Sequence, residues 1–189
     1  MPHFERQTKA NPNVRRCLID SAVNLMVLNR FSSVSVADIA KGAGVTKGGF
    51  FHHFPNKQVL ISAVFDDELK RFDLSIENFL SHESESYGCF TRAYIRSIFI
   101  FCTEEASALT FSLCAEPELM TRWDNWLAQR LERHCSTDCS PTLSVARLAA
   151  DGFWFNHLLK GEKIDISADI KNIQQKLISM TINSDGLVG

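Results

Sequence analysis

The chain has 189 residues, of which 45% are hydrophobic, and its formal net charge at pH 7 is −2. This length accommodates one sizeable core, or a small module joined to a larger one. No apolar run reaches the length of a membrane span, and the N-terminal residues lack the apolar centre of a signal peptide. We therefore expect a cytoplasmic protein with no membrane partner, in which the six scattered cysteines serve as small core residues.

Charge is divided unevenly along the chain. Residues 1–57 contain eight Lys and Arg against three Asp and Glu, whereas residues 58–189 contain twelve against nineteen. A basic head on an acidic body is the distribution expected of a polyanion-binding module attached to a domain that does not bind polyanions. Chance placement of solvated charge is the plain alternative.

The first predicted helix begins at Asn11 and Pro12, a cap followed by a proline at the first helical position. Two short helices then follow, joined by a glycine turn. Ser35 favours the N-cap of the first of these, and Asp38 can complete a capping box. Gly44 stands where that helix must end with a left-handed residue.

The second short helix has two different faces. Phe50 and Phe54 are four residues apart and are expected to point inward. Lys47, Gly48 and Phe51 should therefore point outward. A glycine turn between two helices, the second with an exposed basic face, is typical of a helix-turn-helix that reads the DNA major groove.

The stretch from Val36 to Lys57, VADIAKGAGVTKGGFFHHFPNK, resembles the N-terminal module of the TetR family of transcriptional regulators. The resemblance runs from about residue 14 to residue 64. It implies phosphate contacts near the starts of the helices and along the second one. The residues concerned are Ser35, Val36, Thr46, His52, His53 and Lys57.

Other residues of this stretch suit contacts with bases. Lys47 can donate to guanine or to a phosphate, and Gly48 and Gly49 allow the backbone to approach DNA closely. Phe51 stands where the family usually has Tyr, so a contact with a thymine methyl remains but the hydroxyl hydrogen bond is absent. Adjacent histidines point about 100° apart on a helix, so we expect no metal site there.

Apolar periodicity predicts six further helices, over about 57–80, 89–103, 106–114, 118–134, 142–160 and 166–182, with a turn-rich connection at 135–141. The expected fold is all-α, with about nine helices. Residues 1–56 would form a helix-turn-helix DNA-binding domain, and residues 57–189 a helical domain for ligand binding and dimerisation.

The resemblance also implies a homodimer, paired through its last two helices, that acts as a repressor at a palindromic operator in double-stranded DNA. Small residues and an apolar seam in those helices fit this role, although the seam could equally pack within one chain. The predicted interface residues are Ala146, Ala149, Gly152, Phe153, Ile170, Ile173 and Leu177.

The acidic body is rich in aromatic residues, which suit a small apolar or aromatic effector that releases DNA, or else form an ordinary core. Apart from this effector no cofactor is expected. Arg92, Arg96 and His157 are candidates to orient a polar group. The predicted ligand-binding residues are Phe72, Phe79, Phe90, Tyr94, Phe101, Phe111, Trp123, Trp126 and Trp154.

Two other functions are weighed against this one. An enzyme is not expected, because the sequence has no nucleophile elbow, phosphate-binding loop or His-Glu-x-x-His motif. Cys135 and Cys139 lie four residues apart beside His134. They leave open an alternative input, in which thiol oxidation or metal binding controls the same DNA-binding output.

Overall fold

The computed structural model describes residues 12–29, 34–103, 116–160 and 168–182. The chain divides into two compact units, Met1–Val64 and Phe65–Gly189, and the division falls inside a long helix. Sequence alone placed the domain boundary at the first residue of that helix.

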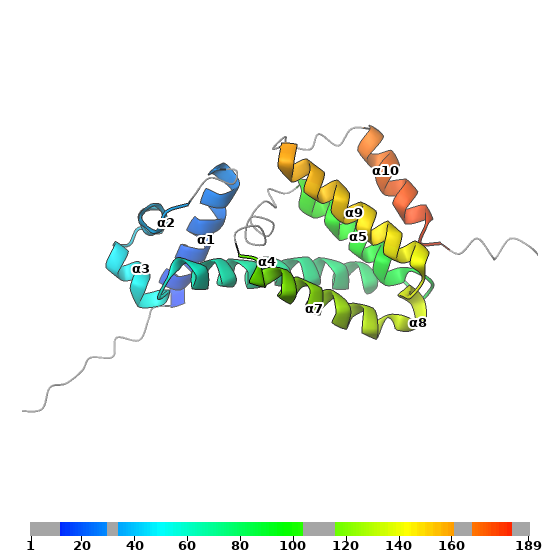
Figure 1. The fold of residues 1–189 in the computed structure, drawn as a ribbon, viewed down its shortest axis with the longest axis horizontal. Helices are drawn as coiled ribbons and strands as arrows, with labels where there is room; N and C mark the ends of the chain where they lie inside the picture. Colours follow the sequence, from blue (N-terminus) through cyan, green and yellow to red (C-terminus); the bar gives the residue numbers. More distant parts are fainter. Residues whose placement is uncertain (1–11, 30–33, 104–115, 161–167, 183–189) are drawn as a thin grey trace, which may run out of the picture. The chain divides into compact units, whose positions relative to one another are not determined.

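Every regular element within the described ranges is an α-helix (Figure 1). The all-α prediction is confirmed, while the helix expected over 106–114 lies outside the described residues. None of the described helices is long and apolar enough to cross a membrane. The helices are α1 (Pro12–Asn29), α2 (Val36–Gly42), α3 (Lys47–His53), α4 (Lys57–Leu80), α5 (Cys89–Thr103), α7 (Glu118–Arg133), α8 (Cys135–Asp138), α9 (Pro141–Lys160) and α10 (Ala168–Ser179).

One element differs from the prediction. The connection expected to be an irregular turn contains a single helical turn, α8. The backbone N–H groups of Thr137 and Asp138 donate to the carbonyl of His134, at 3.0 and 2.8 Å. The predicted turn residues are thus compatible with a short helix, which needs only these local bonds.

The first unit is built around α1, α2, α3 and the beginning of α4. Leu18, Ile39, Phe50 and Leu60, one from each of these helices, are completely buried. The Ser21 hydroxyl donates to the carbonyl of Ile39 at 2.9 Å and ties α1 to α2. These contacts hold the two short helices, which could not be stable alone.

In the second unit α5 and α9 lie side by side, and α10 packs against both (Figure 1). The end of α10 is fastened to the start of α5 because Arg92 donates to the carbonyl and hydroxyl oxygens of Thr181, at 2.7 and 3.0 Å. Gly88 has a positive φ of 71°, and a Cβ there would lie 2.6 Å from the Thr181 carbonyl oxygen. Only glycine allows this close approach.

Candidate nucleic-acid interface and ligand site

The two short helices of the first unit are capped by their own side chains. The hydroxyl of Ser35 accepts from the backbone N–H of Asp38 at 3.1 Å, and that of Thr46 accepts from Gly49 at 3.1 Å. Gly44 between them has the expected left-handed φ of 69°. The Asp38 carboxylate accepts from the Ser35 hydroxyl, whereas the predicted capping box would have it accept from the Ser35 backbone.

α3 turns one face inward and the other to solvent, as predicted. Phe50 and Phe54 are fully buried, whereas Lys47 and Gly48 are exposed and Phe51 is 46% exposed. The outward face therefore combines a cation, bare backbone and an aromatic edge, which suits contact with base edges and phosphates.

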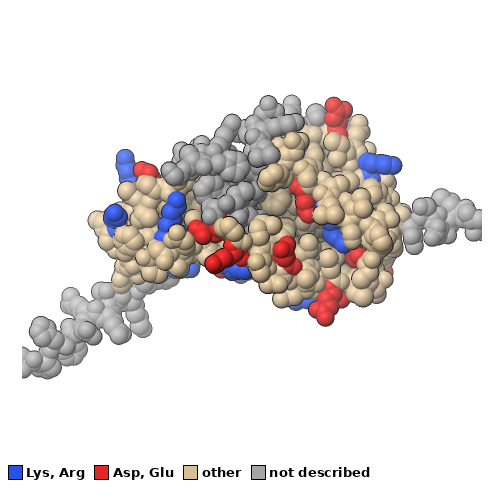
Figure 2. Space-filling view, in the orientation of Figure 1, with Lys and Arg blue, Asp and Glu red and all other residues tan. Residues whose placement is uncertain are grey.

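The remaining predicted DNA contacts surround this face. Ser35, Thr46 and His52 are exposed, and Val36, Gly49, His53 and Lys57 are half-buried. All of them belong to α2, α3, their caps or the first residue of α4. Lys and Arg side chains stand on the visible face of this unit (Figure 2).

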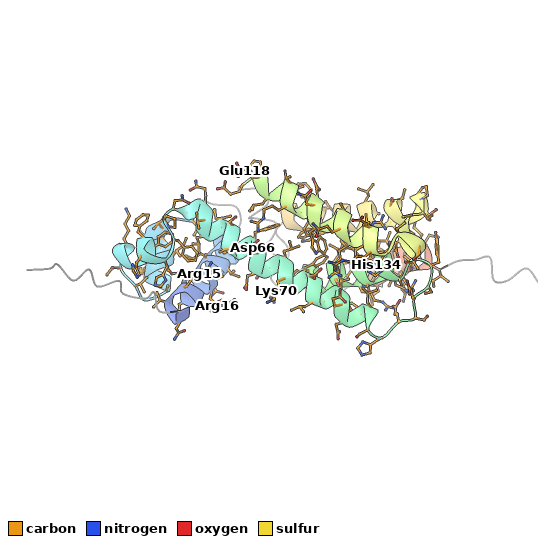
Figure 3. The ribbon with its side chains drawn as sticks, turned by 90° about the horizontal axis from the view of Figure 1, so that it is seen from below. Arg15, Arg16, Asp66, Lys70, Glu118 and His134 are labelled. Atoms are coloured by element: carbon orange, nitrogen blue, oxygen red, sulfur yellow. The ribbon has the colours of Figure 1, made fainter. Side chains whose placement is uncertain are left out.

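His53 has an unusual environment for a phosphate contact. Its Nδ1 is buried and has no hydrogen-bond partner among the described residues. Burial lowers the pKa of His53 below 6.5, and the charges of His52 and Arg15 lower it further. Arg15 on α1 (Figure 3) places its guanidinium 5.0 Å from the centroid of the Phe54 ring. The neutral form of His53 is therefore favoured more strongly than that of an ordinary exposed histidine.

In the second unit an aromatic cluster surrounds Phe72 of α4. The centroid of its ring lies 5.5 Å from that of Tyr94 and 5.1 Å from that of Phe101, both on α5. It lies 5.6 Å from the ring centroids of Trp123 and of Trp126 on α7. These five predicted ligand residues are thus brought together by three helices.

Three other predicted ligand residues lie at the edge of this cluster or apart from it, and one lies outside the description. Trp154 of α9 extends it, because its ring centroid lies 5.9 Å from that of Trp123. The ring centroid of Phe90 lies 6.1 Å from that of Tyr94. Phe79 instead lies beneath the guanidinium of Arg96, at 5.6 Å. Phe111 falls outside the described residues.

Two polar groups near the cluster are not the ones predicted. The Nε1–H of Trp154, a residue only 7% exposed, has no acceptor among the described residues. The Tyr94 hydroxyl donates to Asp151 of α9 at 2.5 Å. Burial raises the pKa of Asp151 from 3.8 to about 6. A donor without an acceptor and a half-buried carboxylate, both on α9, are the kind of polar groups that orient a ligand.

Two of the three predicted polar candidates form ion pairs instead. Arg92 and Arg96 both pair with Glu83, and the side chain of His157 falls outside the described residues. Asp151 was missed in the sequence, although it is the single acid in the apolar run from Leu148 to Phe155, which is a readable signal.

The predicted interface residues divide into buried and exposed ones. Ala146 and Leu177 are buried inside the second unit, so their side chains cannot reach a partner. Phe153 stacks on Phe99, and Ile170 is half-buried. Ala149, Gly152 and Ile173 are exposed.

α9 carries an exposed apolar stripe that was not predicted. Val145, Leu148 and Phe155 are 56%, 70% and 50% exposed. Together with Gly152 they recur every three or four residues, which places them on one side of the helix. The periodic spacing of these residues is visible in the sequence. The sequence does not show, however, which apolar side of α9 packs on the core and which side stays exposed.

Cys135 and Cys139, at the two ends of the α8 region, are both exposed free thiols. A hydrogen bond with Cys135, followed by burial, raises the pKa of Cys139. The two thiols therefore lie close together, as the alternative input requires.

Family models match both units. The model described as "Bacterial regulatory proteins, tetR family" matches residues 18–64, and "Tetracyclin repressor-like, C-terminal domain" matches residues 88–182. The HTH-type transcriptional regulator EthR of Mycolicibacterium smegmatis is 28% identical over 77% of this chain and 74% of its own length. The Transposon Tn10 TetC protein of Escherichia coli is 42% identical, over 40% of this chain and 39% of its own length.

Solved structures share the fold. Multidrug binding protein EbrR complexed with malachite green has a TM-score of 0.66 at 16% identity, covering 89% of this chain and 98% of that one. The fatty acid degradation regulator FadR from Bacillus halodurans has a TM-score of 0.61 at 21% identity, covering 90% and 97%. The capped helix-turn-helix, the helical second unit and the two family matches agree, and the chain belongs to the TetR family of bacterial transcriptional regulators.

Proposed function

We propose that this regulator is a repressor that binds a palindromic operator as a homodimer and is released by a small apolar or aromatic ligand. The observation that carries the DNA-binding part is the outward face of α3, where Lys47, Gly48 and Phe51 are exposed while Phe50 and Phe54 anchor the helix. Its few side-chain hydrogen-bond donors suggest that DNA shape and the spacing of two copies add to specificity.

Selection of bound DNA from a random pool tests this part. We expect the full-length protein to enrich a sequence with two inverted half-sites, since a symmetric dimer presents two copies of α3. Enrichment of a single unrepeated site would contradict the palindrome. Absence of any enriched sequence would contradict specific DNA reading.

The homodimer rests on the exposed stripe of α9, Val145, Leu148, Gly152 and Phe155, and on the exposed Ile173 of α10. Exposed apolar stripes of this kind are uncommon on surfaces that face only water. Sedimentation of the purified protein at micromolar concentration should give twice the mass of the chain. The mass of a single chain would contradict the proposal.

The ligand part rests on the cluster around Phe72 and the unpartnered Nε1–H of Trp154. EbrR, which shares the fold, has been solved with malachite green, with ethidium and with imidazole. A ligand with a planar apolar body and one hydrogen-bond acceptor would suit this cluster, because it could stack on the aromatic rings and accept a hydrogen bond from the Trp154 indole.

Malachite green and ethidium are suitable probes within a wider panel of planar and apolar compounds. We expect at least one compound to bind and to weaken operator binding, and Trp154→Phe to reduce its affinity while the fold persists. Trp126→Phe also keeps an aromatic ring in the cluster but removes an indole N–H that already donates to Asp73 at 2.8 Å, so it should reduce the affinity less than Trp154→Phe does. A panel without any binder would contradict an apolar or aromatic effector.

The exposed pair Cys135 and Cys139 supports a second input, reversible oxidation of the two thiols. Peroxide should then change operator affinity in the original protein and leave the double variant Cys135→Ser/Cys139→Ser unaffected. An identical response of both proteins would contradict thiol control.

A further inference from the structure

Three chemically different side chains converge where α7 and α8 meet the start of α5. The Sγ of Cys89, a ring nitrogen of His134 and a carboxylate oxygen of Asp138 all lie within 4.8 Å of one another. Cys89 and Asp138 are buried and His134 is half-buried. His134 lies at the C-terminal end of α7 (Figure 3).

Backbone hydrogen bonds bring these residues together. The single turn of α8 places Asp138 above His134, because the Asp138 N–H donates to the His134 carbonyl at 2.8 Å. The N–H of Gly88 donates to the Thr137 carbonyl at 2.9 Å and holds the start of α5, with Cys89, against this turn. The backbone segments that carry the three side chains are therefore held together by hydrogen bonds.

Each of the three groups is also oriented by its neighbours. One Asp138 oxygen accepts from the Thr91 N–H at 2.8 Å, and the other accepts from the Phe90 N–H at 3.2 Å and the Thr137 hydroxyl at 2.8 Å. The His134 ring stacks on Phe90, with centroids 5.1 Å apart and 15° between the planes. Groups held in this way resemble metal ligands supported by an outer shell of hydrogen bonds.

We propose that Cys89, His134 and Asp138 form a binding site for a divalent transition metal of the Zn²⁺ class. Thiolate, imidazole and carboxylate are the donors that Zn²⁺ prefers. In a tetrahedral Zn²⁺ site the sulfur and oxygen ligands lie about 3.6 Å apart. The Cys89 sulfur lies 3.9 Å from an Asp138 oxygen, so these two ligands need to close by only a few tenths of an ångström. The ring nitrogen of His134 lies within 4.8 Å of both atoms and has to move closer as the metal binds.

Binding exchanges a proton for the metal. The Cys89 thiol, which makes long hydrogen bonds to the Thr137 hydroxyl at 3.6 Å and to Asp138 at 3.9 Å, releases its proton to solvent as the metal–sulfur bond forms. One thiolate and one carboxylate neutralise the two positive charges, and the neutral imidazole adds none. Water can take the fourth position, on the half-exposed side next to His134.

The Asp138 carboxylate also has a structural role, which explains why it is buried even without a metal. It caps α5 by accepting from the first N–H groups of that helix. The cap does not account for the presence of Cys89 and His134 beside this carboxylate, and the metal would displace only the two long hydrogen bonds of the thiol, to Thr137 and to Asp138. The two roles are therefore compatible.

Co²⁺ is a suitable probe because a thiolate ligand gives it a charge-transfer absorption in the near ultraviolet. We expect the reduced full-length protein to develop this band at one ion per chain, and Zn²⁺ to displace it. Excess Zn²⁺ should also raise the thermal midpoint, since it binds the native state preferentially. Cys89→Ser should abolish the band and weaken Zn²⁺ binding at least about tenfold.

Two control proteins separate this site from the exposed thiols Cys17, Cys135 and Cys139. Cys17→Ser and Cys135→Ser/Cys139→Ser remove exposed cysteines and should keep the band. If Cys89→Ser fails to fold, the half-exposed His134 offers His134→Gln, which should shift the cobalt spectrum and weaken Zn²⁺ binding. Absence of the band in the original protein would overturn the proposal. So would a band that persists in Cys89→Ser and disappears with Cys135 and Cys139.

Discussion

Lys47 and Lys57 carry the same charge but occupy different positions toward DNA. Lys47 is exposed at the first turn of α3, on the face that carries Gly48 and Phe51. Lys57 is half-buried at the start of α4, whose cap Asn56 accepts from the Val59 N–H at 2.9 Å. The first position suits a base edge and the second a phosphate.

We predict that Lys47→Ala lowers affinity for the selected operator by about 1–3 kcal/mol and leaves non-specific binding almost unchanged. Lys57→Ala should weaken both kinds of binding and reduce the salt slope by about 1. Gel shifts over a salt series measure both quantities. Lys70→Ala, an exposed lysine of α4 in the second unit, serves as control. Equal losses for all three variants would contradict these assignments.

Asp151 is a half-buried acid whose native pKa of about 6 lies above its usual 3.8. Between these values the folded protein holds a proton that the unfolded chain has released. The free energy of unfolding therefore falls as pH rises through this window, by at most about 3 kcal/mol. An ionised carboxylate kept at such a cost is typical of a functional position.

We predict that Asp151→Asn removes this dependence, because an amide has no proton to lose while it can still accept from the Tyr94 hydroxyl. Thermal midpoints measured from about pH 4 to pH 7 should fall with rising pH in the original protein relative to the variant. The exposed Asp124→Asn removes the same charge as a control. Parallel curves for the original protein and Asp151→Asn would contradict the assignment.

At the scale of single helices, α3 is a weak helix that its surroundings hold in place. It has seven residues and two consecutive glycines. A Cβ at Gly48 would lie 3.7 Å from the Thr46 hydroxyl oxygen, an ordinary contact, whereas one at Gly49 would lie 3.3 Å from the Val45 Cβ. Position 48 thus has room for alanine, so packing within the chain does not require glycine there.

We predict that Gly48→Ala stabilises the protein by up to about 1 kcal/mol, because alanine is the better helix former. The same change should weaken operator binding, since the added methyl stands on the face that approaches DNA. Chemical denaturation and gel shifts measure the two effects. Unchanged or tighter operator binding would show that the backbone at this position does not come close to DNA.

The helices could be predicted from sequence where the residues that begin or end them lie close together in the chain. Ser35, Thr46 and Asn56 each cap a helix through a residue three positions later, and all three caps are present. The partnership of Cys89 with Asp138 joins residues far apart in the chain, so no local pattern announces it. The same holds for Tyr94 and Asp151, whose contact depends on how α5 packs on α9.

For the molecule as a whole, the central question is what covers the exposed stripe of α9. The resemblance placed the interface on the last two helices, where Ala146 was selected as a small residue and Leu177 as part of an apolar seam, yet both are buried within the chain. A helix packed in a bundle can carry apolar residues on more than one side, and sequence does not say which side faces the core. Leu148, which is 70% exposed, marks the side that remains.

We predict that Leu148→Glu converts the proposed dimer to single chains, because it places a charge in an apolar interface. Affinity for the palindromic operator should fall about 100-fold or more, as the gain from binding two half-sites at once is lost. Affinity for one half-site should stay the same. Leu74→Glu, at a leucine of α4 that is 58% exposed, is the matched control. A dimeric Leu148→Glu protein would contradict the proposed interface.

The contacts of Thr181 with Arg92 and Gly88 determine where the chain can be cut or extended. Arg92 bonds both oxygens of Thr181, and the contact with Gly88 leaves no space for a side chain. A chain that stops at Ile182 retains these bonds, whereas one that stops before Thr181 leaves the Arg92 guanidinium without two of its acceptors. Purification tags and fluorescent fusions are therefore better joined after Ile182 than at any earlier point of α10.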